Sequence, residues 1–213
     1  VGTTAPSDPE LFGYGTQDAS QYPKSRKSMY YATSMAEVLE TVRSHDLQFV
    51  LIGVPCFIRA ARALALLDNV FEKRLAFFVA LVCGHYKTQA FAESLAWQVG
   101  VDPEQLAEVD FRLKAEGRSA SDYSFGARAK GDSHWRERPT RTLVGANWGH
   151  NTFQPEACNF CDDVVGETAD VSFGDAWLPE YVSDPNGTNV VVVRSENINS
   201  LLLAGRQNGE ITL

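Results

Sequence analysis

The stretch QFVLIGVPCFIRAARALALL, residues 48–67, sets the class of this fold. Its first part, Gln48 to Val54, is a continuous apolar run, which suits a buried strand. Its second part, Cys56 to Leu67, is rich in Ala and Leu and predicts a helix. A buried strand that leads directly into a helix is the repeating unit of α/β folds.

The same alternation continues on both sides of this stretch. Upstream, Ser34 can cap a helix whose apolar residues recur at helical spacing up to Val42. Downstream, LAFFVALV at 75–82 predicts a second buried strand, and 88–99 predicts an amphipathic helix that Gly100 closes. We therefore expect an α/β fold with a core of parallel strands.

Beyond Val101 the pattern changes to short strand-like pieces separated by Gly-, Asp- and Ser-rich turns. These pieces lie at 111–114, 123–129, 140–144 and 190–194. We expect an α+β or irregular C-terminal portion that carries a C-x-x-C loop. The change near 101–110 need not divide the chain, so we treat 1–213 as a single domain.

The composition excludes several classes of protein. The chain has 213 residues, is 44% hydrophobic and carries a formal charge of -8, which indicates a globular protein without the basic face that nucleic acid requires. No apolar run reaches the roughly 18 to 20 residues that span a bilayer. Four cysteines without signs of secretion indicate a reducing compartment, and we expect a cytoplasmic protein.

The first 28 residues give little periodic signal. They contain three prolines and several Gly and Ser, which predicts irregular chain that ends in a basic, solvated stretch, Lys24, Arg26 and Lys27. The sequence opens at Val1 without a methionine or a signal-like leader, and we expect a processed product or a fragment.

The four cysteines occupy positions from which they can converge. Cys56 follows the first buried strand and Cys83 ends the second, so both lie at the carboxyl edge of the sheet if these strands are neighbours. Each also lies near the start of a predicted helix, whose partial positive charge favours a thiolate. Cys158 and Cys161 form a C-x-x-C pair, which lets two thiolates reach one metal centre.

Spacing alone leaves several interpretations open. Either Cys56 or Cys83, taken singly, can be a small buried hydrophobe. The C-x-x-C pair also serves zinc and thioredoxin-like redox sites, although here it follows Pro155 in irregular sequence and does not open a helix after a strand. A structural zinc bound by all four thiolates is the stronger rival to an iron–sulfur cluster.

Four motifs carry a resemblance to a known family. The segments are GVPCFIRAARAL (53–64), VCGHYKTQAF (82–91), FRLK (111–114) and CNFCDDVVGETADVSFGDAW (158–177). In order and spacing the sequence resembles the beta-subunit family of the deazaflavin (factor 420) reducing hydrogenase and related dehydrogenases, from about residue 28 to 194. The resemblance implies FAD, at least one 4Fe–4S cluster, and electron transfer between them.

The resemblance also implies roles for individual residues. The cysteines of the family's motifs correspond to Cys56, Cys83, Cys158 and Cys161, which would be the ligands of the cluster. The chain has no further cysteine for additional clusters. The family's glycine-rich N-terminal segment, which helps to form its flavin pocket, is not evident before Val1.

The remaining site candidates come from what a flavin needs. A flavin requires donors for its pyrophosphate and a cation near the ring, and no G-x-G-x-x-G fingerprint is present. Candidate cofactor-binding residues are His85, Lys87, Arg112, Lys114, Gly174 and Asp175. Each of the four cations could instead be a solvated surface residue, and Asp175 could only cap a turn.

These observations lead to two hypotheses from different classes. The first is an oxidoreductase subunit in which FAD passes electrons between a deazaflavin or other reducible ring substrate and the 4Fe–4S cluster, with a partner subunit or ferredoxin as redox partner. No general base is assigned. The second is a non-catalytic assembly or interaction subunit with a structural four-cysteine zinc site.

Overall fold

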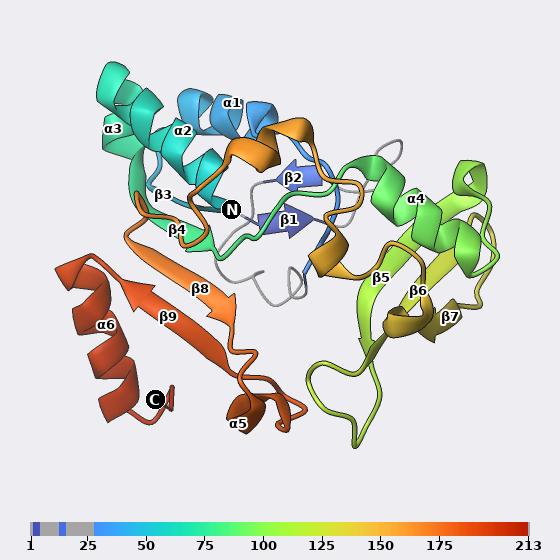
Figure 1. The fold of residues 1–213 in the computed structure, drawn as a ribbon. Helices are drawn as coiled ribbons and strands as arrows, with labels where there is room; N and C mark the ends of the chain where they lie inside the picture. Colours follow the sequence, from blue (N-terminus) through green and yellow to red (C-terminus); the bar gives the residue numbers. More distant parts are fainter. Residues whose placement is uncertain (1, 5–12, 16–27, 213) are drawn as a thin grey trace.

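The computed structural model describes residues 2–4, 13–15 and 28–212. Two sheets dominate this part of the chain (Figure 1). The first has the strand order β3-β4-β8-β9 and the second the order β5-β6-β7, each with its own hydrophobic core. The basic stretch at 24–27 lies outside the described residues.

The first sheet confirms the α/β prediction. Strand β3 (Phe49–Gly53) pairs in parallel with β4 (Leu75–Leu81), and β4 pairs in parallel with β8 (Val171–Asp175). The edge strand β9 (Asn189–Val193) is antiparallel to β8, so the sheet is mixed. The two strands that precede Cys56 and Cys83 are therefore neighbours, as the argument from strand ends required.

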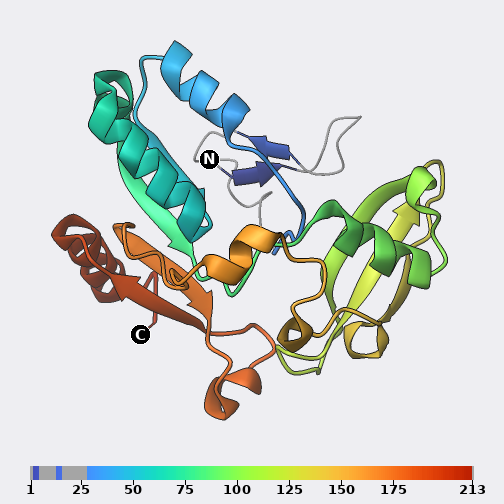
Figure 2. The same ribbon diagram turned by 45° about the horizontal axis from the view of Figure 1, so that its top comes forward.

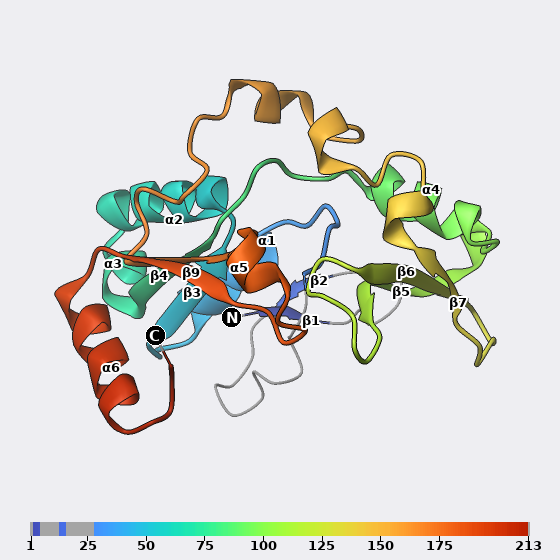
Figure 3. The same cartoon turned by 60° about the horizontal axis from the view of Figure 1, so that its bottom comes forward.

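Helices α1 (Ala36–Ser44), α2 (Pro55–Leu67) and α3 (Asn69–Arg74) pack into the core of this sheet, and α2 lies along one face of the strands (Figure 3). Pro55 suits the first turn of α2, where a missing N–H costs no hydrogen bond. Asp68 ends α2 and starts α3, because its carboxylate accepts a hydrogen bond from the Val70 N–H. The core beneath these helices includes Val38, Leu51, Ile58 and Phe78.

The C-terminal helix lies on the other side of the sheet. Helix α6 (Glu196–Gln207) follows β9 and contains no buried residue (Figure 3). Short helix α5 (Pro179–Val182) precedes β9 in the connection from β8. None of the helices in the described ranges is long and apolar enough to cross a membrane.

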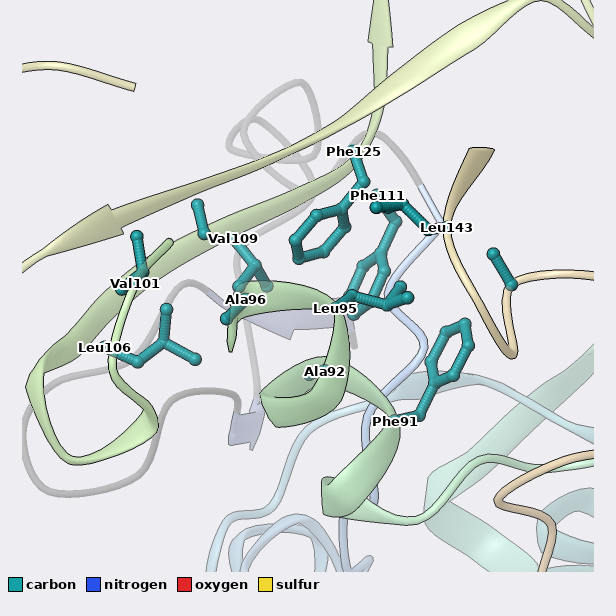
Figure 4. Close-up of a cluster of buried hydrophobic side chains, with 12 residues drawn as sticks. Phe91, Ala92, Leu95, Ala96, Val101, Leu106, Val109, Phe111, Phe125 and Leu143 are labelled. Carbon is teal, nitrogen blue, oxygen red and sulfur yellow. The ribbon is translucent and has the colours of Figure 1, made fainter. Parts of the chain in front are cut away.

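The second sheet is inserted between β4 and β8. It consists of the antiparallel strands β5 (Leu106–Lys114), β6 (Tyr123–Ala129) and β7 (Arg136–Pro139). Helix α4 (Gln89–Gln98) lies across it, and its side chains Phe91 and Leu95 meet Phe111 and Phe125 of the strands (Figure 4). The change of pattern noted near 101–110 coincides with the turn η2 (Pro103–Gln105) and the start of β5.

Two local predictions differ from the structure. The sequence predicts a strand-like piece at 140–144, but Thr140–Thr142 form the 3-10 turn η3, in which the Thr142 hydroxyl donates to the Pro139 carbonyl oxygen. Leu143 then enters the second core. Within the first 28 residues, β1 (Gly2–Thr4) and β2 (Gly13–Gly15) pair antiparallel, a ladder too short to leave a periodic signal.

Candidate functional site

The four cysteines meet at the carboxyl edge of the first sheet. Cys56 opens α2 directly after β3, and Cys83 follows β4. Cys158 lies in the 3-10 turn η5 (Glu156–Phe160), and Cys161 follows it. Figures 1 and 2 show this turn, in orange, beside the end of α2 at which Cys56 lies.

Hydrogen bonds fix the C-x-x-C segment against this edge. The Cys83 N–H donates to the Val164 carbonyl oxygen at 3.0 Å, and the Tyr86 N–H points to the Cys158 sulfur at 3.4 Å. Arg59 of α2 forms an ion pair at 3.4 Å with Asp163, whose side chain is only 2% exposed. The segment is thus tied to both the β4 end and α2.

The thiols lie close enough to influence one another. Burial, and then the charges of the other three cysteines, raises the pKa of the Cys83 thiol to about 12. Burial also raises the pKa of Cys56, and the Phe57 N–H partly opposes this. Because a metal binds the thiolate, ligation at Cys83 would release a proton at neutral pH.

The four thiols form a donor set that suits a metal centre. In the part of the chain that the structure describes, no three His, Cys, Asp or Glu side chains are placed to hold a single metal ion. A tetrahedral zinc with Zn–S distances of about 2.3 Å would bring its sulfurs to roughly 3.8 Å from one another. Four thiolates can bind either such a zinc ion or a 4Fe–4S cluster.

His85 and Lys87 are two of the residues that the sequence suggested as cofactor contacts, and they follow Cys83 closely in the chain. Lys87 is only 2% exposed, and its ammonium donates to the Thr152 carbonyl oxygen at 2.6 Å and lies over the rings of Phe91 and Trp148. It is therefore a buried cation, and burial lowers its pKa. The His85 ring lies 4.4 Å from that of Trp148, and its buried Nε2 has no hydrogen-bond partner in the described part of the protein.

Arg112, Lys114 and Asp175 come together at a separate pocket. Arg112 donates to the Asp175 carboxylate at 2.9 Å and to the Tyr30 hydroxyl, and its guanidinium lies over the ring of Trp177. The pocket has a volume of about 70 Å³. Its lining comprises Arg112, Lys114, Ala120, Asp175, Ala176, Trp177, Asn186, Gly187, Thr188 and Asn189.

Gly174 has a packing reason in this structure. A Cβ at this position would lie 2.7 Å from Cγ2 of Val82, so the glycine lets β8 approach the end of β4. Asp170, just before β8, accepts from the Phe78 N–H at 2.7 Å and from Arg62 at 2.7 Å, and so holds the same two strands together.

An aromatic path links the thiol edge to the pocket, and sequence reasoning missed it. From His85 it passes through Trp148, whose ring lies 4.8 Å from that of Tyr30, and Tyr30 accepts from Arg112. Tyr30 gave no signal, because a single tyrosine in an irregular segment has no pattern.

The fold and the site define a class: an α/β protein with a candidate multi-thiol centre at the edge of its parallel strands. Residues 46–213 match the family model that describes the C terminus of the coenzyme F420 hydrogenase/dehydrogenase beta subunit. Because this match covers most of the sequence, the chain belongs to that family. This confirms the resemblance derived from the four motifs.

The comparison with solved structures supports the fold. The protein is similar to a chain of the F420-reducing nickel–iron hydrogenase complex from Methanosarcina barkeri, with a TM-score of 0.65 and 17% sequence identity. The match covers 98% of this chain and 66% of that chain, which is just under two thirds of its length. A search of curated proteins found no match.

Proposed function

We propose that this protein is an iron–sulfur flavoprotein subunit of an oxidoreductase. In this proposal it passes electrons between a reducible ring substrate of the deazaflavin type and a 4Fe–4S cluster by way of FAD. The observation that carries the proposal is the convergence of Cys56, Cys83, Cys158 and Cys161 at one sheet edge, where burial and then the charges of the other three thiols raise the pKa of Cys83. Family membership supports it.

Cys56, Cys83, Cys158 and Cys161 would hold the cluster. All four are free thiols, and four thiolates are the usual ligand set of a 4Fe–4S cluster. Because free thiols persist in a reducing compartment, we place the protein in the cytoplasm.

The flavin would lie between the thiol edge and the arginine pocket. A flavin couples the two-electron chemistry of a ring substrate to one-electron transfer. Trp148 and Tyr30 offer apolar faces along this path, and the buried ammonium of Lys87 places a fixed positive charge behind Trp148. Arg112 supplies a second positive charge at the far end.

Electrons would leave the protein through a redox partner. The similar chain belongs to a multi-subunit hydrogenase complex. We accordingly propose a partner subunit or a ferredoxin as the electron-transfer partner. Phe160, which lies between the two cysteines of the C-x-x-C pair and is 83% exposed, is placed where such a partner would approach the cluster.

Anaerobic purification tests the proposal directly. Iron, acid-labile sulfide and zinc are measured together with the visible spectrum, and we expect about four irons and four sulfides per chain. The double variant Cys158→Ser, Cys161→Ser should lose this iron. Phe160→Ala, a change in the same turn that leaves every thiol in place, should keep it.

Two results would contradict the proposal. A colourless protein with one zinc per chain would support the structural-zinc alternative. Unchanged iron content in the double cysteine variant would show that the metal binds elsewhere.

A further inference from the structure

We infer that the pocket between the ends of β5 and β8 binds a phosphoryl group. This inference rests on the proposed function and deepens it. It assigns the phosphate of a ligand to the Arg112 end of the aromatic path, and the reactive ring of that ligand to the end near the cysteines. The pocket is formed by Arg112 and Lys114 of β5, by Asp175 of β8, and by the loop 176–189.

The charge of the pocket favours an anion. Two of its lining residues are cations and one is a carboxylate, so the lining has an excess of one positive charge. Asp175 forms its ion pair with Arg112. Lys114 donates to the Pro185 carbonyl oxygen at 2.9 Å and has no carboxylate partner among the residues that the structure describes. The lysine charge is thus available to a ligand.

The pocket also retains unused hydrogen-bond donors. The five N–H donors of Arg112 face three neighbouring acceptors, namely Asp175 and the hydroxyl groups of Tyr30 and Tyr123, and its buried Nε has no partner in the described ranges. A planar guanidinium combined with a lysine point charge is the donor set that suits phosphate oxygens.

A glycine keeps the pocket open beside the lysine. Gly187 has a φ of +81°, and a Cβ built on it would lie 3.8 Å from Nζ of Lys114. Any other residue would be strained in this backbone conformation and would place its side chain next to the lysine. The local sequence thus leaves space where Lys114 can meet a ligand.

The size of the pocket suits a phosphoryl group and excludes a flavin-sized ring system. Its volume of about 70 Å³ is far below the roughly 300 to 1,000 Å³ of sites that enclose a whole ligand. It has room for one compact group, so the remainder of the ligand must lie outside. Trp177 at its rim is 47% exposed and contacts Arg112. Beyond Arg112 the aromatic path leads to the thiols.

The phosphoryl group can come from FAD, from FMN, from a phosphorylated ring substrate or from free phosphate. Binding of FAD, FMN, riboflavin, inorganic pyrophosphate and acetate to the anaerobic full chain is measured by flavin fluorescence and calorimetry. The variants are Lys114→Gln and Gly187→Ala. Lys130→Gln is the control for an exposed lysine. Gly117→Ala is the control for backbone strain, because its φ is +77° and nothing lies within 4 Å of its Cβ position.

We expect Lys114→Gln to weaken pyrophosphate and FAD binding about tenfold or more, because one charge-assisted hydrogen bond is lost. Riboflavin should bind within about twofold of the wild type, since it lacks a phosphate. Gly187→Ala should weaken the same two ligands, whereas Lys130→Gln and Gly117→Ala should not. Displacement of pyrophosphate by FAD and FMN would assign the group to the flavin. Bound pyrophosphate that neither flavin displaces would assign it to a substrate or free phosphate.

Failure of the inference can be told from failure of the proposed function. If FAD binds but Lys114→Gln weakens riboflavin equally, or weakens neither ligand, the phosphoryl assignment is overturned while the flavin remains. If acetate competes as well as pyrophosphate, the pocket is a general anion site and the assignment is also overturned. If no flavin binds but pyrophosphate binds through Lys114, the phosphoryl site stands and the flavin proposal fails.

Discussion

Lys87 shows most clearly how a single residue can change meaning between sequence and structure. In the sequence it is a cation near a predicted helix start and a candidate flavin contact. In the structure it is 2% exposed, with its ammonium on the Thr152 carbonyl and over two aromatic rings. Its charge can act on a neighbouring group through a poorly solvated interior, where electrostatic interactions are stronger than at the surface.

Burial of Lys87 predicts a specific dependence of stability on pH. Its pKa is lowered in the folded protein, so the unfolded chain binds the proton more tightly. The free energy of unfolding of the wild type, relative to Lys87→Met, should therefore be lowest below the folded pKa and rise with pH up to about 10.5. A folded-state pKa that lies one below the unfolded value would contribute about 1.4 kcal/mol to this rise.

Urea unfolding of the metal-free protein at pH 7.5, 9 and 10.5 measures this difference. At pH 7.5 His85 is neutral, because burial and the nearby Lys87 lower its pKa, and it does not contribute. Lys73→Met, at an exposed helical lysine, is the control for loss of a lysine charge. A flat profile for Lys87→Met would show that the buried ammonium keeps an ordinary pKa.

At the scale of elements, the contact between β4 and β8 positions the site. The Val82 N–H donates to the Phe173 carbonyl oxygen, and Cys83 follows immediately. Asp170 anchors the start of β8 to β4 through the Phe78 N–H. The two strand ends that carry Cys83 and Asp175 are thereby held in register. This pairing fixes the position of the cysteines relative to the pocket that contains Asp175.

Substitution of Gly174 tests whether a glycine is needed here for the contact between β4 and β8 or for a bound cofactor. Gly174→Ala should destabilise the protein by about 1 to 3 kcal/mol, because the new methyl would meet Val82 at 2.7 and 2.8 Å. Chemical unfolding measures the loss. The double variant with Val82→Ala should recover only part of it, because alanine removes Cγ2 of Val82 but keeps its Cβ, which lies 2.8 Å from the added methyl group.

A different outcome would favour the original expectation for Gly174. If stability is unchanged while flavin affinity falls, the glycine serves close approach of a cofactor and the strand contact is of minor importance.

At the scale of the whole molecule, the cysteines bracket an insertion. The chain leaves the first sheet at Cys83, builds α4 and the second sheet with its separate core, and returns through Cys158 and Cys161 to β8. A cluster bound by these thiols would close the base of the insertion. Through Cys56, it would also connect α2 to the segment that leaves the first sheet at Cys83 and to the segment that returns through Cys158 and Cys161.

Removal of iron should therefore loosen the base of the insertion and leave both cores intact. Hydrogen exchange by mass spectrometry, with and without the metal, should show faster exchange in peptides that cover 82–88 and 155–166. Peptides from α1 and from the centre of α4 should exchange at unchanged rates and serve as internal controls. A uniform increase would indicate global destabilisation, and no change would mean that the thiols do not hold the metal.

Much of the first sheet, and the helix that packs on the second, could be predicted from the sequence. The apolar runs that became β3 and β4, and the helices that became α1, α2 and α4, lie within one or two residues of the expected bounds. Such elements are specified by local periodicity and end signals. The same local reasoning placed Cys56 and Cys83 at strand ends. It failed at 140–144, where entry of Leu143 into the second core decides the backbone.

The sequence by itself determined the strand-to-helix order, the spacing of the four cysteines and the family. Only the tertiary structure decided that Lys87 is buried, that β8 joins the sheet beside β4, and that Arg112 meets Asp175, 63 residues away in the chain. The physical reason is that periodicity reports which face of an element is buried, whereas such contacts depend on how separate elements pack. The phosphoryl pocket exists only because that packing brings β5 to the end of β8.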